Sequence, residues 1–315
     1  MLHACGRKIA LSIFAALAVA LTAGAHADPP GVAAAPAAVA RSASAAELPP
    51  LDASTSLLVV APHPDDETLC CAGVIQRVLQ AGGHASVVWI TSGDASELDL
   101  LLVERSLLLE PAKLRDLAVR RMHEARAATT LLGITIDGQL FLGYPDRGVQ
   151  PLLTDHQTRT YTSRFTAAAA VPYPDAVSPG HSYTGASLEQ DLGAVLDRVR
   201  PTLVLTASPR DSHPDHAAAG VLTLRVMARR GQLAAVRCWI VHGGEGWPSP
   251  RELSPGLPLE RAPRSGSEPL GIFRLTPAEE DRKLAALRAY STQMQTLAPF
   301  LLSFVRTTES FSAAR

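Results

Sequence analysis

Residues 57–68 read LLVVAPHPDDET and join four apolar residues to a histidine, two prolines and three consecutive acids. The apolar run is typical of a strand that is buried on both faces of a parallel sheet. Adjacent carboxylates repel one another and cost solvation when they are covered, unless a cation or a reaction uses them. In open α/β sheets, ligands bind beyond the carboxyl ends of the strands. The stretch therefore predicts a parallel sheet with a functional site directly after this strand.

Similar short apolar runs recur along the chain and alternate with segments of helical periodicity. The expected strands are 57–62, 85–93, 202–208 and 236–243, and the expected helices are 68–79, 114–133, 187–201 and 276–293. This alternation indicates an α/β fold with a doubly wound, mostly parallel sheet of Rossmann-like type, helices on both faces and a smaller irregular C-terminal part. Residues 150–186 and 243–270 are long, rich in Pro and Gly, and irregular, so we expect them to form functional rims.

The first 27 residues have the order of a cleavable export signal. Arg7 and Lys8 precede an uncharged apolar run, and Ala25-His26-Ala27 supplies the small residues of a cleavage site. The run is short for a bilayer span, which needs about 20 residues. We therefore expect residues 1–27 to be a signal peptide and the protein to be periplasmic or secreted, with an uncleaved anchor as the alternative. Residues 28–54 have the Ala-, Pro- and Ser-rich composition of a linker, which leaves 55–315 as one folded domain.

Composition limits both the partners and the cross-links of the chain. The 315 residues carry a formal net charge of −1 and 5% aromatic residues, which argues against nucleic acid and against stable membrane association after signal cleavage. Cys5 lies in the expected signal, and adjacent cysteines such as Cys70 and Cys71 rarely pair with each other. We expect these two and Cys238 to be buried thiols, with a bridge from Cys238 to one of the pair as the alternative.

Two clusters of metal-ligand residues follow predicted strands. They are His63-Pro64-Asp65-Asp66 and His213-Pro214-Asp215-His216, which together offer three imidazoles and three carboxylates. Two histidines and one carboxylate form a common catalytic zinc site that leaves a position open for water. A helix cap could explain the first cluster alone, but the second cluster makes a metal site the stronger hypothesis. The same ligand types also suit iron or manganese.

The motifs around these clusters resemble those of the PIG-L/LmbE-like zinc-dependent N-deacetylases. They are PHPDDE (62–67), TSGD (91–94), RRMHEARAATTLLGI (120–134), FLGYPD (141–146) and HPDH (213–216). The likeness runs in order from about residue 57 to 220, whereas the C-terminal third resembles the family's variable region only weakly. The resemblance implies an LmbE-like deacetylase domain at 55–315 with one Zn²⁺ per chain, Fe²⁺ being an alternative.

The resemblance also implies roles for the residues of both clusters. The implied metal ligands are His63, Asp66 and His216. Asp65 would be the general base that acts on the metal-activated water. His213 would stabilise the oxyanion or protonate the leaving amine, and Asp215 would orient His213 and favour its protonated form.

Assignments outside the clusters rest on single positions. Arg121 and Asp146 match the family's sugar-contacting arginine and aspartate, although Arg121 would equally suit a surface helix and Asp146 a turn. His242 is expected at the rim of the site rather than among the ligands. Glu67 is left with a place near the start of a helix.

Together these residues predict a zinc-dependent hydrolase that removes N-acetyl groups from an N-acetylated amino sugar or glycoconjugate. A zinc amidase that acts on a non-sugar amide is one alternative, and a catalytically inactive carbohydrate-binding relative is another. The intact Asp65, His213 and Asp215 argue against the inactive relative. The export signal favours an envelope polysaccharide, a cell-wall fragment or a secreted metabolite as the substrate.

Overall fold

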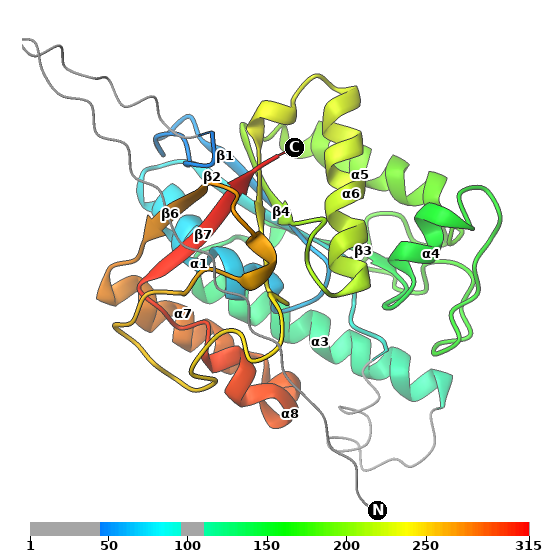
Figure 1. The fold of residues 1–315 in the computed structure, drawn as a ribbon. Helices are drawn as coiled ribbons and strands as arrows, with labels where there is room; N and C mark the ends of the chain where they lie inside the picture. The colour runs from blue at the N-terminus through cyan, green and yellow to red at the C-terminus, as the bar shows by residue number, and fades with distance from the viewer. Residues whose placement is uncertain (1–44, 96–109, 315) are drawn as a thin grey trace, which may run out of the picture. The chain divides into compact units, whose positions relative to one another are not determined.

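A seven-stranded sheet organises the part of the chain that the structure describes (Figure 1). The computed structural model describes residues 45–95 and 110–314. The strands are β1 (Ser56–Ala61), β2 (His84–Thr91), β3 (Gln139–Tyr144), β4 (Leu203–Ala207), β5 (Val236–Trp239), β6 (Leu270–Arg274) and β7 (Thr308–Ala313). The helices are α1 (Asp66–Gln80), α3 (Pro111–Leu131), α4 (Val149–Thr154), α5 (Gly185–Val199), α6 (Pro214–Arg229), α7 (Pro277–Ala289) and α8 (Ser291–Leu302). The strand order across the sheet is β3-β2-β1-β4-β5-β7-β6.

The strands from β3 to β5 in that order are parallel. β1 lies among them, with β2 on one side and β4 on the other. The chain runs outward from β1 to β3, returns to β4, and then runs outward in the opposite direction to β5. The carboxyl ends of β1 and β4 therefore lie side by side at a topological switch point, where open sheets bind ligands.

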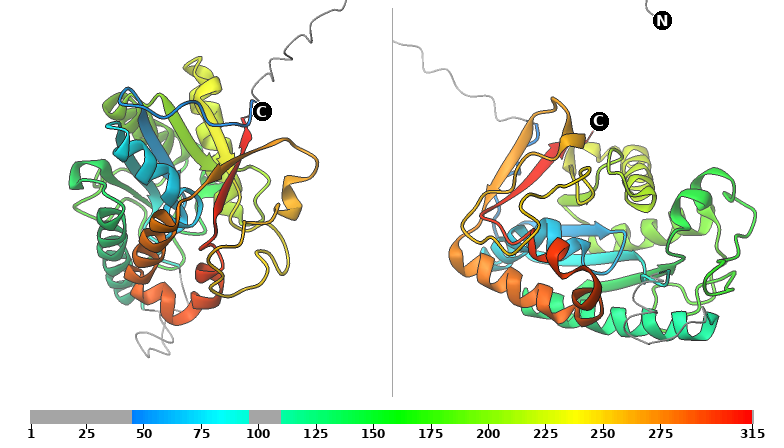
Figure 2. Two further views of the ribbon diagram at one scale, coloured as in Figure 1. Left: turned by 90° about the vertical axis from the view of Figure 1, so that its left-hand side faces the viewer. Right: turned by 60° about the horizontal axis from the view of Figure 1, so that its bottom comes forward.

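Both faces of the sheet are covered by helices. Leu57 and Val59 of β1 face a core formed with α1, α3, α7 and α8, whereas Leu58 and Val60 face a second core formed with α4, α5 and α6. Figure 2 shows α3 and α7 packed together on the first side, in agreement with their contacts. A strand that is buried on both faces has to be apolar throughout, which explains why LLVV shows no alternation. The predicted doubly wound, mostly parallel sheet is confirmed.

The C-terminal part is more regular than expected. β7 pairs antiparallel with β5, and β6 pairs antiparallel with β7, so the two strands extend the sheet at its β5 edge. The single helix expected at 276–293 is two helices, α7 and α8, which meet at the buried Tyr290. Tyr290 has φ −78° and ψ 66°, outside the helical region, and this interrupts the helix. β7 has the sequence TESFSA, which contains no apolar run and gives no strand signal.

Residues 45–54 belong to the folded unit, although their composition predicts a linker through residue 54. Ala46 is buried, and Leu48 and Leu51 pack against the core. Gly271 of β6 permits this approach, because a Cβ there would lie 2.2 Å from the Ala46 carbonyl oxygen. The domain boundary predicted at residue 55 therefore moves toward the N-terminus. The expected signal peptide at 1–27 and the first part of the expected linker lie outside the described residues. Among the helices of residues 45–95 and 110–314, none is long and apolar enough to cross a membrane.

The structure corrects the expectation for the adjacent cysteines. Cys70 and Cys71 of α1 are joined by a disulfide bond, which closes a small ring around the peptide unit between them. Their spacing argued against such a bond, because disulfides usually join Cα atoms that are farther apart. Cys238 is a buried free cysteine, as expected, and burial raises the pKa of its thiol to about 12.

Candidate metal centre and active site

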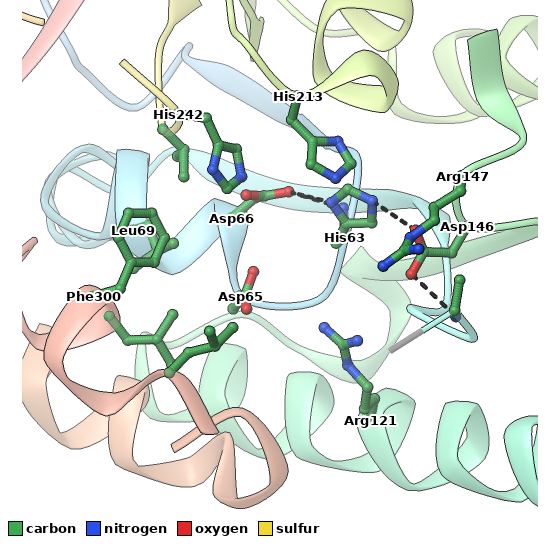
Figure 3. Close-up of a pocket in the computed structure, with 14 residues that line it drawn as sticks. His63, Asp65, Asp66, Leu69, Arg121, Asp146, Arg147, His213, His242 and Phe300 are labelled. Atoms are coloured by element: carbon green, nitrogen blue, oxygen red, sulfur yellow. Dashed lines mark hydrogen bonds and ion pairs between the residues drawn. The ribbon is translucent and has the colours of Figure 1, made fainter. Parts of the chain in front are cut away.

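The loops at the carboxyl ends of the parallel strands meet around one pocket (Figure 3). β1 leads into His63 and α1, and β4 leads through Asp211 into α6. β5 is followed by His242, and β3 is followed by Asp146. The pocket has a volume of about 210 Å³. The structure thus brings the two predicted clusters together with Arg121 and Asp146, although these segments are far apart in the sequence.

The three predicted metal ligands form a triangle of donor atoms. Nδ1 of His63 lies 3.2 Å from Nε2 of His216 and 3.4 Å from Oδ2 of Asp66, and the same Oδ2 lies 3.2 Å from Nε2 of His216. Ligand atoms about 2.0–2.1 Å from a tetrahedral zinc ion stand about 3.3–3.4 Å from one another. The donor types and their spacing therefore fit a zinc site with three protein ligands.

Two other groups of ligand-type side chains share His63. One adds His213 and His216, and the other adds Asp146 and Asp215. Both oxygens of Asp215 already accept backbone N–H groups, and the Nδ1 of His213 already accepts one. Oδ2 of Asp66 also accepts a backbone N–H, from His63 at 2.9 Å, but it completes a triangle whose three sides have the spacing of tetrahedral ligands, so the set with Asp66 fits a metal better.

The carboxylate of Asp211 faces the second ring nitrogen of His216. Oδ2 of Asp211 lies 3.4 Å from Nδ1 of His216 and accepts the backbone N–H groups of Val241 (2.9 Å) and His242 (3.0 Å). Burial alone would lower the pKa of His216, but Asp66 and Asp211 raise it to about 9, so the site has a negative potential that suits a cation. Asp211 was not among the site residues predicted from the sequence. Its only signal is its place in the loop of the second cluster, five residues before His216.

His63 has carboxylate neighbours on its other side as well. Its Nε2 lies 3.3 Å from Oδ1 of Asp146 and 3.5 Å from Oδ2 of Asp215. Histidines that bind a metal through one nitrogen usually direct the other ring N–H toward a carboxylate or a carbonyl oxygen, which fixes the tautomer and the ring orientation. Both His63 and His216 have such a neighbour, so their surroundings also match those of metal ligands.

Asp65 lies next to the triangle and lines the pocket. Its backbone has φ 116°, which residues with a Cβ rarely adopt. Among the described residues its carboxylate accepts no hydrogen bond. Burial and the charge of Asp66 raise the pKa of this carboxyl well above its usual value. A buried carboxyl with a raised pKa and unoccupied oxygens is suited to proton transfer.

His213 and Asp215 lie at the start of α6, but their contact differs from the expectation. The Asp215 carboxylate accepts the backbone N–H groups of Arg147 (2.6 Å) and Val149 (3.1 Å) instead of contacting the His213 ring. The backbone N–H of Asp215 donates to Nδ1 of His213 at 3.3 Å, which leaves the proton of a neutral imidazole on Nε2. Burial and the neighbouring imidazoles, His63 first, lower the pKa of His213 to about 3. These contacts favour neutral His213, whereas the family resemblance implied its protonated form.

Arg121 is a buried residue of α3 and not a surface residue. Its Nη1 donates to the Gly93 carbonyl oxygen (2.9 Å) and its Nη2 to the Pro64 carbonyl oxygen (3.4 Å). Gly93 has φ +69°, and a Cβ there would lie 2.3 Å from Nη1 of Arg121, so this close approach requires glycine. Asp146 accepts the backbone N–H of Ala95 at 3.2 Å. Both predicted sugar-contacting residues line the pocket, and both also hold its loops in place.

The two walls of the pocket differ in character. The polar wall contains Arg121, Asp146 and Arg147, and the apolar wall contains Leu69, Val241, Leu297, Phe300 and Leu301. Figure 3 shows Leu69 and Phe300 on the side away from Asp146. His242 lines the pocket between them and the triangle; its ring stacks on Phe300 and is 4.6 Å from the His216 ring. The pocket can therefore accommodate a molecule with a polar and an apolar part.

Comparison with known sequences connects this geometry to a family. The sequence model described as PIG-L, GlcNAc-PI de-N-acetylase, matches residues 58–227. The 1D-myo-inositol 2-acetamido-2-deoxy-alpha-D-glucopyranoside deacetylase of Kribbella flavida is 30% identical over 277 residues, which cover 78% of this chain and 84% of that protein. The deacetylase of the same name from Mycobacteroides abscessus is 28% identical over 252 residues, which cover 76% of this chain and 81% of that protein.

Solved structures share the fold. The A40926 pseudoaglycone deacetylase Dbv21 superposes with a TM-score of 0.54 at 21% identity, covering 82% of this chain and 96% of that one. N,N'-diacetylchitobiose deacetylase from Pyrococcus horikoshii superposes with a TM-score of 0.50 at 19% identity, covering 81% of this chain and 82% of that one. The family match extends from β1 into α6 and includes the donor triangle, Asp65 and His213. The chain belongs to the PIG-L family of de-N-acetylases.

Proposed function

We propose that this protein is a metal-dependent hydrolase that removes the N-acetyl group from an N-acetylated amino sugar or glycoconjugate. The observation that carries the proposal is the donor triangle of His63, Asp66 and His216, with the carboxyl of Asp65 beside it in the pocket. The relatives from K. flavida and M. abscessus are named as deacetylases of a 2-acetamido-2-deoxyglucopyranoside. Those names support an acetamido sugar as the part of the substrate that reacts.

We propose zinc as the metal, with one ion per chain held by the triangle. Three protein ligands leave a fourth position open, as in catalytic zinc sites. When bound, zinc supplies a Lewis acid for the acetamide carbonyl and lowers the pKa of water. Metal analysis of the purified protein distinguishes zinc from iron or manganese, which the same ligand types accept.

Asp65 is proposed as the general base that accepts a proton from the attacking water. Its carboxyl lines the pocket, and its raised pKa brings it toward the range in which a general base works best at neutral pH. The proton that it accepts is then available for the leaving amine, so that amide and water become amine and acetate.

His213 is proposed to stabilise the carbonyl oxygen as negative charge develops on it. The backbone N–H of Asp215 occupies Nδ1 of His213, so the ring can donate from Nε2. A hydrogen-bond donor that is already in place costs no reorganisation during the reaction, which is why such donors contribute strongly to catalysis.

The polar wall is proposed to receive the sugar. Arg121 and Asp146 would contact its hydroxyl groups, as the family resemblance implies. We also propose that the protein is exported, on the grounds of the N-terminal sequence alone, and that its substrate belongs to the cell envelope or is secreted. N-terminal sequencing of the mature protein from its host tests the predicted cleavage after Ala27.

Acetate release from a panel of compounds tests the proposed function. The panel contains N-acetylated monosaccharides and disaccharides, together with N-acetylated amines that lack a sugar. We expect release from the sugars and much less from the simple amides, whereas equal rates on both would indicate a general amidase. Asp65→Ala should keep the metal and lose turnover. Sugar binding without acetate release by the wild-type protein would indicate the inactive relative.

A further inference from the structure

Glu67, the third acid of PHPDDET, has no part in the proposed reaction. It is nevertheless fully buried beside residues 62–66, the loop that carries His63, Asp65 and Asp66 and is called the metal loop below. Its carboxylate receives four groups. Oε2 accepts the indole N–H of Trp89 (2.8 Å) and the backbone N–H of Asp65 (3.3 Å), and Oε1 accepts the hydroxyls of Thr68 (2.6 Å) and Tyr290. The indole and the backbone amide can only donate, so Oε2 has to act as an acceptor. A glutamate whose only role is to begin a helix would not need four hydrogen-bond donors around its carboxylate.

The hydrogen bond to Asp65 holds one end of the Pro64–Asp65 peptide unit. The other end of the same unit is the Pro64 carbonyl oxygen, which accepts Nε2 of Gln293 (3.0 Å) and Nη2 of Arg121 (3.4 Å). Gln293 comes from α8 and Glu67 from α1. The peptide unit is therefore fixed at both its N–H and its C=O by side chains from different helices.

This peptide unit determines the direction of the Asp65 side chain. Asp65 has φ 116° and ψ −32°, and a residue with a Cβ keeps such a conformation only where its surroundings hold it. Rotation of the peptide unit would change φ of Asp65 and move its carboxylate relative to the donor triangle. The two hydrogen-bonded ends oppose that rotation.

We propose that Glu67 is a positioning residue, which together with Gln293 fixes the Pro64–Asp65 peptide unit so that the carboxylate of Asp65 points into the pocket. The inference rests on the proposed role of Asp65 as the general base. In this proposal, hydrogen bonds to the backbone orient the Asp65 side chain. Some of the residues that take part, 290–293, lie beyond the segment that the family model matches.

Glu67→Met tests the proposal, because it keeps the bulk of the side chain and removes both acceptors. We expect kcat to fall about 100-fold, the loss typical of a misplacement of about 1 Å, with KM and the bound metal per chain unchanged. Glu67→Gln should retain most of the activity. Its carbonyl oxygen can take the place of Oε2, and the Thr68 and Tyr290 hydroxyls can turn to accept its amide N–H groups.

Gln76→Met is the matched control. Gln76 is equally buried on the same helix, and its amide donates to the carbonyl oxygens of Ala72 and Glu279, away from the metal loop. This variant should lower the thermal midpoint to a similar extent as Glu67→Met and leave kcat unchanged. If Glu67→Met does not fold, Gln293→Leu replaces it. That variant should lower kcat about tenfold with the metal content unchanged.

A double-mutant cycle with Asp65→Ala decides whether Glu67 acts through Asp65. When Asp65 is already alanine, the further change Glu67→Met should leave the residual rate unchanged. A further loss of the same factor, a loss of bound metal in Glu67→Met, or an undiminished kcat in that variant would each overturn the inference and leave the role of Asp65 standing. Full activity of Asp65→Ala would refute the proposed base, and this inference with it.

Discussion

Asp211→Asn should weaken metal binding, although Asp211 is not one of the proposed ligands. Asp211 is nearly isosteric with Asn, but the substitution removes the negative charge that faces Nδ1 of His216 at 3.4 Å. Carboxylates that orient a metal-binding histidine are typically worth about 10–100-fold in metal affinity, or about 1.4–2.7 kcal/mol.

The hydrogen bonds of Asp211 set an additional cost. Oδ2 accepts two backbone N–H groups, from Val241 and His242, and Oδ1 accepts one, from His213. The lower-energy orientation of the Asn side chain places its amide nitrogen at the Oδ1 position. Only the backbone N–H of His213 then loses its acceptor. An unsatisfied buried donor costs about 1–3 kcal/mol, so the free energy of unfolding of the metal-free protein should also fall by about that amount.

Zinc affinity measured by competition with a chelator is the assay, and denaturant unfolding of the metal-free protein gives the stability. Asp191→Asn is the control, because Asp191 is also buried but accepts the hydroxyls of Tyr144 and Ser178 outside the pocket. If Asp211→Asn loses stability as the control does and keeps the wild-type zinc affinity, Asp211 has no part in holding His216 for the metal.

Three further outcomes are expected. Dialysis against a chelator should abolish acetate release and lower the thermal midpoint, because a metal at a hundredfold excess over its Kd stabilises the folded state by about 2.7 kcal/mol. Added zinc should restore both the activity and the midpoint. Full activity without metal would contradict the proposed metal site. Gly93→Ala should destabilise the protein by about 1–3 kcal/mol in denaturant unfolding, since its Cβ would lie 2.3 Å from Nη1 of Arg121 at a positive φ, and an unchanged midpoint would show that this approach is not constrained. Cys238 should resist thiol reagents in the native protein and react after denaturation, because it is buried and has a raised thiol pKa; rapid labelling of its peptide, detected by mass spectrometry, would contradict that burial.

The parallel core and the two clusters that supply the donor triangle could be predicted because their signals are local, whereas the choice of the three ligands among six side chains was implied by the family resemblance. A strand that is covered on both faces is apolar in every position, as LLVV is, and each half of the triangle lies in one short motif. The topology then brings the ends of β1 and β4 together.

The remainder of the site depends on contacts that leave no local pattern. The role of Asp211 follows only from the folded structure, in which its carboxylate faces His216 and the backbone after β5. Tyr290 resembles any other residue of a helical segment until the break between α7 and α8 is known. The family resemblance implied a contact between Asp215 and His213, whereas the Asp215 carboxylate accepts the backbone N–H groups of Arg147 and Val149 after β3.

The first turn of α8 carries Gln293, which supports the metal loop, and Leu297, Phe300 and Leu301 of the same helix form much of the apolar wall. If the proposed function holds, the residues that set substrate preference and those that support the proposed base lie within a dozen positions of one another. Substitutions at 297 and 300 can change which substrates fit the pocket, provided that α8 keeps the position in which Gln293 donates to the Pro64 carbonyl oxygen. A library intended to redirect this protein to new substrates should therefore vary those two positions and leave residues 290–293 constant. A shift of α8 would break the hydrogen bond from Gln293 to Pro64 and lower kcat, even if the substrate preference changed as intended.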